Sequence, residues 1–417
     1  MRILVITSYF PPSRLGWGYM QLCEEVTGGL AARGHHLAVL TSTCRDGAEI
    51  ERGYPVLRLL EIDPDWSTKH SAAWQFFADR RARERRALAH LQQVNSSLQP
   101  DIIFIWDAIG LPRALLLAAE RCVSATTVYY FANFLPELPD EYMAYWQREP
   151  PTVIGKLTKG VVGHVALEQL RREGKPVPLQ YRHVICVSQY LRQRFVSKGL
   201  VPESAVVIYN GIDLSTFSSN RSDISALPSN PLRCLVAGRV VPDKGIHTVI
   251  DAFGLLGQRD ETRGQVSLTI LGDGPADYMA YLYQRVAALG IKDLIHFVAP
   301  VQRAQMPEIL AKHDALILPS EYGEPIARSM QEAMAMGLLV IGTLTGGSGE
   351  LLRDEENGLV FAPADAQALA TQVARASAMP GLRARLAQQG QQDVRAQFDI
   401  RMTVEKIEDY LVERGSP

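Results

Sequence analysis

A strand, a short loop and the start of a helix follow one another in Leu318-Pro-Ser-Glu-Tyr-Gly-Glu-Pro-Ile-Ala-Arg-Ser-Met-Gln-Glu-Ala-Met-Ala-Met-Gly337. The apolar residues before Pro319 predict a buried strand. Proline is favoured at the first position of a helix, where its missing N–H costs nothing, so we expect a helix to begin at Pro325. The N–H groups of Ile326 and Ala327 would then be free to bind an anion.

Two glutamates of this stretch are candidates for binding a long polar ligand. Glu324 stands at the mouth of the expected helix, and Glu332 follows eight residues later, about 12 Å along a helix axis. This separation suits a ligand with hydroxyls at both ends and phosphates between them, such as a nucleotide sugar. The alternative is a capping glutamate and a solvated one on an amphipathic helix. Because Ala-Met-Ala-Met-Gly follows Glu332 and predicts a tightly packed face, we expect its carboxylate to have hydrogen-bond or ion-pair partners.

A second passage with the same strand-to-helix pattern is Cys234-Leu-Val-Ala-Gly-Arg-Val-Val-Pro-Asp-Lys-Gly245. Gly238, Arg239 and Lys244 follow the carboxyl end of its strand. Two cations at this place would hold a diphosphate and neutralise the charge that develops as it departs. The alternative is a pair of solvated surface charges.

Two glycine-containing loops are weaker signals. Gly16 and Gly18 lie between the first strand and the first helix, without the third glycine of a dinucleotide fingerprint, and would let the backbone approach a ligand. The stretch Thr345-Gly-Gly-Ser-Gly-Glu350 is either a backbone that approaches a ligand or a turn.

Short apolar runs alternate with longer helical patterns along the whole chain, which predicts parallel sheets covered by helices on both faces. We expect a two-domain α/β protein of two facing, doubly wound, Rossmann-like domains with a ligand cleft between them. The predicted order is an N-terminal domain at 1–212 with a helical insertion at about 134–180, a linker at 213–231, a second domain at 232–398, and a C-terminal helix at 399–417 that packs on the first domain. The predicted strands are Ile3–Ile6, Leu37–Leu40, Val56–Leu60, Asp101–Trp106, Thr126–Tyr130, Val184–Val187, Val206–Tyr209, Cys234–Ala237, Val266–Leu271, Ile295–Val298, Ala315–Leu318 and Leu338–Ile341.

Composition excludes several classes of protein. The chain has 417 residues, 47% of them hydrophobic and 21% charged, which is the balance of a soluble globular protein. A net charge of −2 provides no field to attract nucleic acid. Apolar runs are too short for a membrane span or a signal peptide. Five scattered cysteines favour a reduced, cytoplasmic location and no disulfide framework.

One predicted helix, from about Ser71 to Val94, carries Trp74, Phe76 and Phe77 close to five arginines. Aromatic and basic residues together suit an anionic lipid surface, so weak peripheral contact with the inner membrane is one reading. We prefer an ordinary amphipathic helix with a solvated basic side. No histidine has metal-ligand spacing with cysteine or a carboxylate, so no metal is expected.

These motifs together resemble the large retaining glycosyltransferase family 4, and the resemblance covers nearly the whole chain. It rests on the Pro11-Pro12…Gly16 loop, Leu30-Ala-Ala-Arg-Gly-His-His-Leu-Ala-Val-Leu-Thr41, Tyr209-Asn-Gly-Ile-Asp213, Gly238-Arg…Lys244-Gly, Leu271-Gly-Asp-Gly-Pro275, Glu324…Glu332-Ala-Met-Ala-Met-Gly, Gly346-Gly…Glu350 and Glu356-Asn-Gly-Leu359.

The resemblance implies the GT-B fold and transfer of a sugar from a nucleotide donor to a hydroxyl, with retained anomeric configuration and no essential metal or other cofactor. By position, Arg239 and Lys244 match the diphosphate-binding pair, Glu324 the glutamate at the donor sugar, and Glu332 the one that binds the ribose hydroxyls. The remaining donor-binding matches are Gly16, Gly18, Gly238, Pro325, Ile326 and Ala327.

Two positions depart from the family pattern. Many members have a histidine after the fourth strand of the first domain, where this chain has no histidine and Asn133 is the substitute we expect. Val298 precedes Ala299-Pro300 where a glycine near the nucleobase is usual. Polysaccharide, glycolipid and small-molecule acceptors all fit. The alternatives are a nucleotide-sugar epimerase on the same fold, which would convert the donor without an acceptor, and a non-catalytic nucleotide-sugar-binding protein.

Overall fold

The computed structural model describes residues 1–13, 17–62, 75–138, 142, 146–147, 153–173, 177–218, 231–260, 262 and 264–415. The chain forms two compact units. Unit 1 contains Met1–Val187, Leu191–Ile208 and Val404–Pro417, and unit 2 contains Ser188–Tyr190 and Tyr209–Thr403. Most of the predicted linker, residues 219–230, lies outside the described residues.

Unit 1 is built on a sheet of seven parallel strands in the order β3-β2-β1-β4-β5-β6-β7. The predicted apolar runs form these strands, and most of their residues are buried. The last strand has only two residues, fewer than predicted. The strands are β1 (Arg2–Thr7), β2 (His36–Ser42), β3 (Val56–Leu60), β4 (Ile102–Ile105), β5 (Thr126–Phe131), β6 (His183–Cys186) and β7 (Val206–Val207).

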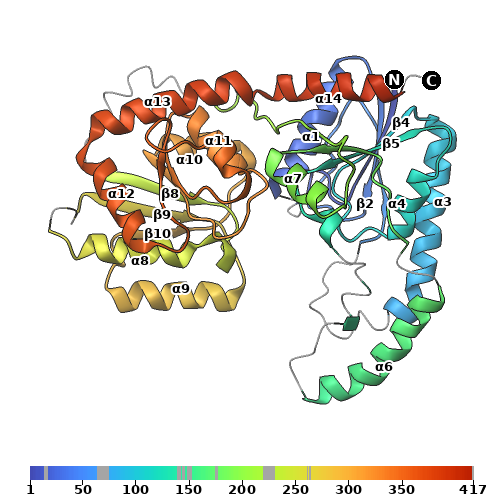
Figure 1. The fold of residues 1–417 in the computed structure, drawn as a ribbon, viewed down its shortest axis with the longest axis horizontal. Coiled ribbons are helices and arrows are strands. Elements are labelled where there is room, and N and C mark those ends of the chain that lie inside the picture. Colours follow the sequence, from blue (N-terminus) through green and yellow to red (C-terminus); the bar gives the residue numbers. More distant parts are fainter. Residues whose placement is uncertain are drawn as a thin grey trace. The chain divides into compact units, whose positions relative to one another are not determined.

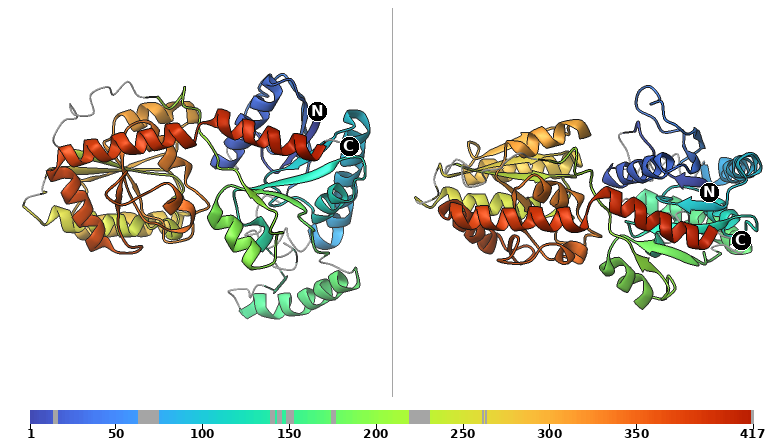
Figure 2. Two further views of the ribbon diagram at one scale, coloured as in Figure 1. Left: turned by 45° about the horizontal axis from the view of Figure 1, so that its top comes forward. Right: turned by 90° about the horizontal axis from the view of Figure 1, so that it is seen from above.

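Helices surround this sheet. α14 begins in unit 2, and from Val404 onward it belongs to unit 1, where it runs beside α1 (red and blue in Figures 1 and 2). There Glu408 binds Arg33 and His35. The described helices that contain unit 1 residues are α1 (Trp17–Ala32), the π-helical turn η1 (Gln75–Asp79), α3 (Arg80–Leu98), α4 (Arg113–Glu120), η2 (Leu135–Glu137), α6 (Val153–Arg172), α7 (Gln189–Ser197) and α14 (Ile400–Gly415).

The basic helix α3 differs from the expected amphipathic helix. Residues 63–74, including Trp74, lie outside the described residues. Arg80 and Arg83 are buried rather than solvated, with Arg80 bound to Glu173 and Arg83 to Asp79. Their charges are therefore neutralised inside unit 1. Within the described parts of the chain, every helix is too short or too polar to cross a lipid bilayer.

Unit 2 repeats the strand order with six parallel strands, β10-β9-β8-β11-β12-β13. The sequence did not predict β13, which has only two residues. Helix α8 packs against both α9 and α12, and α11 packs against α13 (Figure 1). The strands are β8 (Leu232–Ala237), β9 (Val266–Leu271), β10 (Ile295–Val298), β11 (Ala315–Leu318), β12 (Leu339–Gly342) and β13 (Leu359–Val360). The helices are η4 (Pro242–Lys244), α8 (Ile246–Gly257), α9 (Ala276–Leu289), η5 (Arg303–Gln305), α10 (Met306–Ala311), α11 (Arg328–Ala335), η6 (Gly346–Glu350), α12 (Ala366–Ala378) and α13 (Pro380–Gln397).

Both sheets have a switch point, where the order in which successive strands are added to the sheet reverses. Strand order turns back between β1 and β4 in unit 1, and between β8 and β11 in unit 2. In open parallel sheets, ligands bind outside the carboxyl ends of the strands at such a switch point. The loops that follow these four strands are therefore the places to look for a site.

Candidate active site

The switch point of unit 2 brings two of the predicted site residues into direct contact. Lys244 Nζ in the loop after β8 donates to Oε1 of Glu324, which follows β11. Ser320 Oγ donates to the same oxygen, and Tyr322 OH donates to Oε2 at 2.8 Å. Glu324 is only 4% exposed. A buried carboxylate with three donors is held in one place, and its ammonium partner belongs to the predicted diphosphate pair.

Tyr322 lies close to the carboxylate and to Lys244, and the charge of Arg239 also acts on its hydroxyl. Burial, together with the charge of Glu324, raises the pKa of the Tyr322 hydroxyl well above its usual value, and the nearby charge of Arg239 opposes this shift. Lys244 Nζ lies 5.2 Å from the centre of the Tyr322 ring. Arg239 is exposed, directly after Gly238 at the end of β8. The hydroxyl is therefore a neutral donor beside an exposed guanidinium.

The two loops approach each other at the level of the backbone. Gly245 has φ +66°, and a Cβ at this position would lie 2.2 Å from the carbonyl oxygen of Pro319. Glu321 N donates to Asp243 O at 2.9 Å. No other residue type fits at Gly245, because any side chain would separate the loops that carry Lys244 and Glu324.

The glycine-rich stretch after β12 packs against the backbone of Glu324. It forms the 3-10 helix η6, and Gly347 N donates to Glu324 O at 2.7 Å. Gly346 has φ +61°, and a Cβ there would lie 2.2 Å from the same carbonyl oxygen. Gly346 is thus required by close packing against the backbone of Glu324, and Gly347 by close packing against the carbonyl oxygen of Pro325, 2.0 Å from a Cβ there.

The helix after Glu324 begins later than predicted. Helix α11 starts at Arg328, and Ala327 precedes it with an extended backbone (φ −84°, ψ 114°), so the prediction of a helix from Pro325 is wrong. The Glu324 carbonyl, which would be the first acceptor of a helix that starts at Pro325, accepts a hydrogen bond from Gly347 N–H in the structure. Ile326 and Ala327 are each 7% exposed.

Glu332 is buried and has the partners that its sequence context predicted. Its Oε1 accepts a hydrogen bond from Arg303 Nη1, and Arg328 Nε lies 3.9 Å from the same oxygen. The guanidinium of Arg303 in turn lies 4.6 Å from the ring centre of Phe217. Sequence reasoning missed Arg303, because it lies in η5 with no motif around it. Val298, the last residue of β10, is partly exposed, and its carbonyl accepts from Gly272 N at 3.0 Å.

At the carboxyl edge of unit 1, Asn133 is bound to Asp107 beyond β4. Asn133 Nδ2 donates to Asp107 Oδ1 at 3.2 Å, and Asn133 Oδ1 accepts from Leu135 N at 3.0 Å. Ile109 N also donates to Asp107 Oδ1, at 3.1 Å. Burial raises the pKa of Asp107 to about 6, against the hydrogen bonds that lower it. Sequence reasoning missed Asp107, although an acid directly after the apolar strand was a usable signal.

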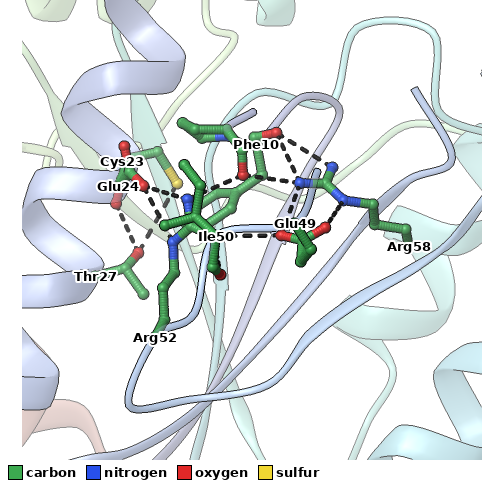
Figure 3. Close-up of polar contacts among 9 residues, drawn as sticks. Phe10, Cys23, Glu24, Thr27, Glu49, Ile50, Arg52 and Arg58 are labelled. Carbon is green, nitrogen blue, oxygen red and sulfur yellow. Dashed lines mark hydrogen bonds and ion pairs between the residues drawn. The ribbon is translucent and has the colours of Figure 1, made fainter. Parts of the chain in front are cut away.

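The loop between β1 and α1 is anchored by two arginines (Figure 3). Arg58 donates to the carbonyl oxygens of Phe10 and Pro11, and Arg52 donates to Pro11 O at 3.0 Å. Glu24 and Glu49 pair with these guanidinium groups. This part of the predicted glycine loop is therefore fixed in place. Gly18 is exposed on α1, and Gly16 lies outside the described residues.

Two family profiles match consecutive parts of the chain. "Glycosyltransferase Family 4" matches residues 21–216, and "Glycosyl transferases group 1" matches residues 218–393. Curated relatives carry related names. A glycogen synthase of Mycobacterium tuberculosis is 26% identical over 412 residues, which are 96% of this chain and 91% of that protein. An uncharacterized glycosyltransferase of Methanocaldococcus jannaschii is 29% identical over 413 residues, 94% of this chain and 93% of that protein. A putative glycosyltransferase of Bacillus subtilis, YtcC, is 28% identical over 206 residues, and the match spans 45% of this chain and 49% of that protein.

Solved structures share the fold over the full length. Sucrose-phosphate synthase from Thermosynechococcus elongatus superposes with a TM-score of 0.72 at 19% identity, covering 99% of this chain and 98% of that one. Anabaena HepE, solved in complex with UDP, gives 0.69 at 22% identity, covering 99% and 100%. The strand order, the two consecutive profiles and these neighbours agree: the chain belongs to the group 1 glycosyltransferases and has the GT-B fold.

Proposed function

We propose that this glycosyltransferase moves a sugar from a nucleoside-diphosphate sugar to a hydroxyl acceptor with retention of anomeric configuration and without a metal ion. The observation that carries the proposal is the Lys244–Glu324 pair, held by Ser320 and Tyr322 next to Arg239. The solved complex of HepE with UDP supports a nucleotide donor. The composition and the free cysteines favour a cytoplasmic location.

In the proposed reaction, the cations of unit 2 supply the charge stabilisation. The bond between the sugar C1 and the diphosphate oxygen breaks, and its electron pair leaves with the diphosphate. The acceptor oxygen bonds to C1 on the same face, and its proton passes to the departing diphosphate. Arg239 and Lys244 stabilise the negative charge that grows on the leaving group, which is the role that a metal ion would otherwise take.

Lys244 exchanges partners in this proposal. With no donor bound, its ammonium neutralises Glu324; when the diphosphate arrives, the ammonium turns to the phosphate oxygens. Glu324 then retains the hydroxyl donors Ser320 and Tyr322 and accepts hydrogen bonds from the sugar hydroxyls. Arg303 likewise binds the Glu332 carboxylate, which accepts hydrogen bonds from the ribose hydroxyls when the donor is bound. After the exchange the ammonium faces the phosphate and the carboxylate accepts from hydroxyl groups, so each charged group is hydrogen-bonded before and after binding.

The test begins with thermal unfolding in the presence of UDP, GDP, ADP, CDP or dTDP, with and without Mg²⁺. We expect one nucleotide to stabilise the protein selectively and to the same extent in both conditions. A ligand at 100 times its dissociation constant adds about 2.7 kcal/mol. The matching α-linked nucleotide sugar is then supplied with an acceptor mixture and EDTA, and the anomeric signal of the product is read by NMR.

The outcomes separate the proposal from its alternatives. An α-linked product formed in EDTA supports it, whereas a β-linked product refutes retention and loss of turnover in EDTA refutes metal independence. Conversion of the donor without acceptor indicates the epimerase alternative. Stabilisation by a nucleotide without transfer to an acceptor or conversion of the donor would indicate the non-catalytic alternative. No stabilisation by any nucleotide would refute the nucleotide site in unit 2.

A further inference from the structure

A cavity lies at the carboxyl edge of the unit 1 sheet, apart from the residues discussed so far. Its walls come from the segments that follow β3, β4 and β5, from the first turns of α3, and from the segment that leads into β6. It is next in sequence to Asp107, since Ala108, Gly110 and Leu111 line it. Of the two loops at the switch point of unit 1, the one that follows β4 lines this cavity.

Among the residues that the structure describes, one cation of this cavity has no carboxylate partner. Arg113, the first residue of α4, donates through Nε to the carbonyl oxygen of Val177 at 3.0 Å. Among the described residues, its two terminal nitrogens have no hydrogen-bond or ion-pair partner. The other acidic and basic groups of the wall are matched: Arg80 binds Glu84, and Glu61 binds Arg86. Within the described part of the chain, the charge of Arg113 is therefore not compensated by a carboxylate, and its two terminal nitrogens are available as donors.

Arg80 belongs to the wall of the same cavity but is not available to a ligand. Its guanidinium binds Glu173, and its side chain has no exposed surface. A bound molecule therefore meets Arg113 as the accessible cation among the described residues of the wall.

The rest of the lining is largely apolar. Leu111 and Leu116 are buried, and Leu135 and Leu179 are partly exposed towards solvent. Apolar walls beside a single uncompensated guanidinium do not suit a plain oligosaccharide, which needs donors and acceptors around its ring. They suit an anion that carries a hydrocarbon portion.

We propose that this cavity binds the acceptor through an anionic group, a phosphate or carboxylate held by Arg113, with an adjacent apolar portion against the leucines. That the bound molecule is the acceptor rests on the proposed function. That the cavity binds such an anion rests on unit 1 alone. A lipid-linked phosphate and a soluble phosphorylated acceptor share this chemistry, and they differ in the apolar portion.

The test measures binding to the full chain by calorimetry with three probes. These are n-octyl phosphate below its micellar concentration, inorganic phosphate, and the uncharged n-octyl glucoside. We expect octyl phosphate to bind at least tenfold more tightly than either of the others. Arg113→Gln should weaken octyl phosphate binding by about ten- to a hundredfold, because a charge-assisted hydrogen bond is removed. Arg113→Lys should retain part of the affinity.

Two controls keep the result specific. Arg121→Gln removes an exposed cation just beyond the other end of α4 and should leave binding unchanged. Leu179→Ala should weaken the binding of octyl phosphate by about fourfold for each methylene of the ligand that is no longer buried, and leave the binding of inorganic phosphate unchanged. Circular dichroism of each variant checks that it folds.

Each remaining outcome overturns the proposal. Equal affinity for octyl phosphate and octyl glucoside, or an unchanged affinity in Arg113→Gln, refutes anion binding at Arg113. Equal affinity for octyl phosphate and inorganic phosphate refutes the apolar portion and leaves a soluble phosphate as the ligand. The nucleotide-induced thermal shift, which depends on unit 2, is measured on the same samples. Loss of that shift with intact probe binding would refute the donor proposal and not the cavity.

Discussion

The carboxyl edges of the two sheets are built differently, although both sheets have the same strand order. In unit 2 two cations of the site are already paired with carboxylates, Lys244 with Glu324 and Arg303 with Glu332. In unit 1 the half-buried Asp107 is held by neutral donors, and Arg113 in the nearby cavity has no carboxylate partner among the described residues. Paired charges can exchange partners when a polyanion binds, whereas an uncompensated charge selects its ligand by sign. One fold thus supports two modes of recognition.

The largest effect should come from breaking the pair in unit 2. Lys244→Ala should lower kcat by about 10²–10³, because the departing diphosphate loses a preorganised cation. Turnover is measured with the donor that the thermal screen identifies. Lys312→Ala is the matched control, since Lys312 forms an exposed pair with Glu308 in the same unit. Full turnover by Lys244→Ala would contradict the assignment of the site.

Asp107, the carboxylate of unit 1, should make the stability of the protein depend on pH. The pKa of Asp107 is raised to about 6 in the fold, so the folded protein holds this proton more tightly than the unfolded chain. Asp107 therefore contributes fully to the free energy of unfolding below about pH 4. This contribution is lost as the pH rises towards 6, by up to about 3 kcal/mol. In urea unfolding, the free energy of unfolding of Asp107→Asn should rise relative to that of the natural protein as the pH increases across this range. A difference that stays constant with pH would argue against the raised pKa.

Packing behind Glu324 should matter for turnover even though it touches no ligand in the proposed reaction. Gly346→Ala places a Cβ against the backbone of Glu324 and should lower kcat by about ten- to a hundredfold through misplacement of the carboxylate. Gly264→Ala is a sharp control, because Gly264 has φ +72° with open space around it. It reports backbone strain alone, so equal losses of turnover in the two variants would remove the role given to the contact with Glu324.

The smallest effect should come from the outer pair of unit 2. Arg303→Gln leaves Arg328 as the cation next to Glu332 among the described residues. It should raise KM for the donor by about tenfold with little change in kcat, since the ribose is bound equally in ground and transition states. Steady-state kinetics separate the two constants. Arg285→Gln, which removes a surface pair with Asp251, serves as the reference. A fall in kcat without a change in KM would place Arg303 in the chemical step.

Prediction from sequence succeeded where a motif is continuous and adjoins a strand. Lys244 and Glu324 lie a few residues after β8 and β11, so the pairing of neighbouring parallel strands brings them to one edge. It failed where the partner is distant in the chain. Helix α11 starts at Arg328 and not at Pro325, and the Glu324 carbonyl accepts a hydrogen bond from Gly347, a contact that no local pattern reveals.

The sequence by itself determined the two parallel sheets, since fully apolar runs of four to six residues are stable only when both faces are buried. It also determined which loops carry the charges. Only the tertiary structure decided which charges are neutralised: Arg80 is matched by Glu173, and Arg113 has no carboxylate partner among the described residues. The physical reason is that the Coulomb energy of a charge depends on distances and burial, which depend on residues far apart in the chain.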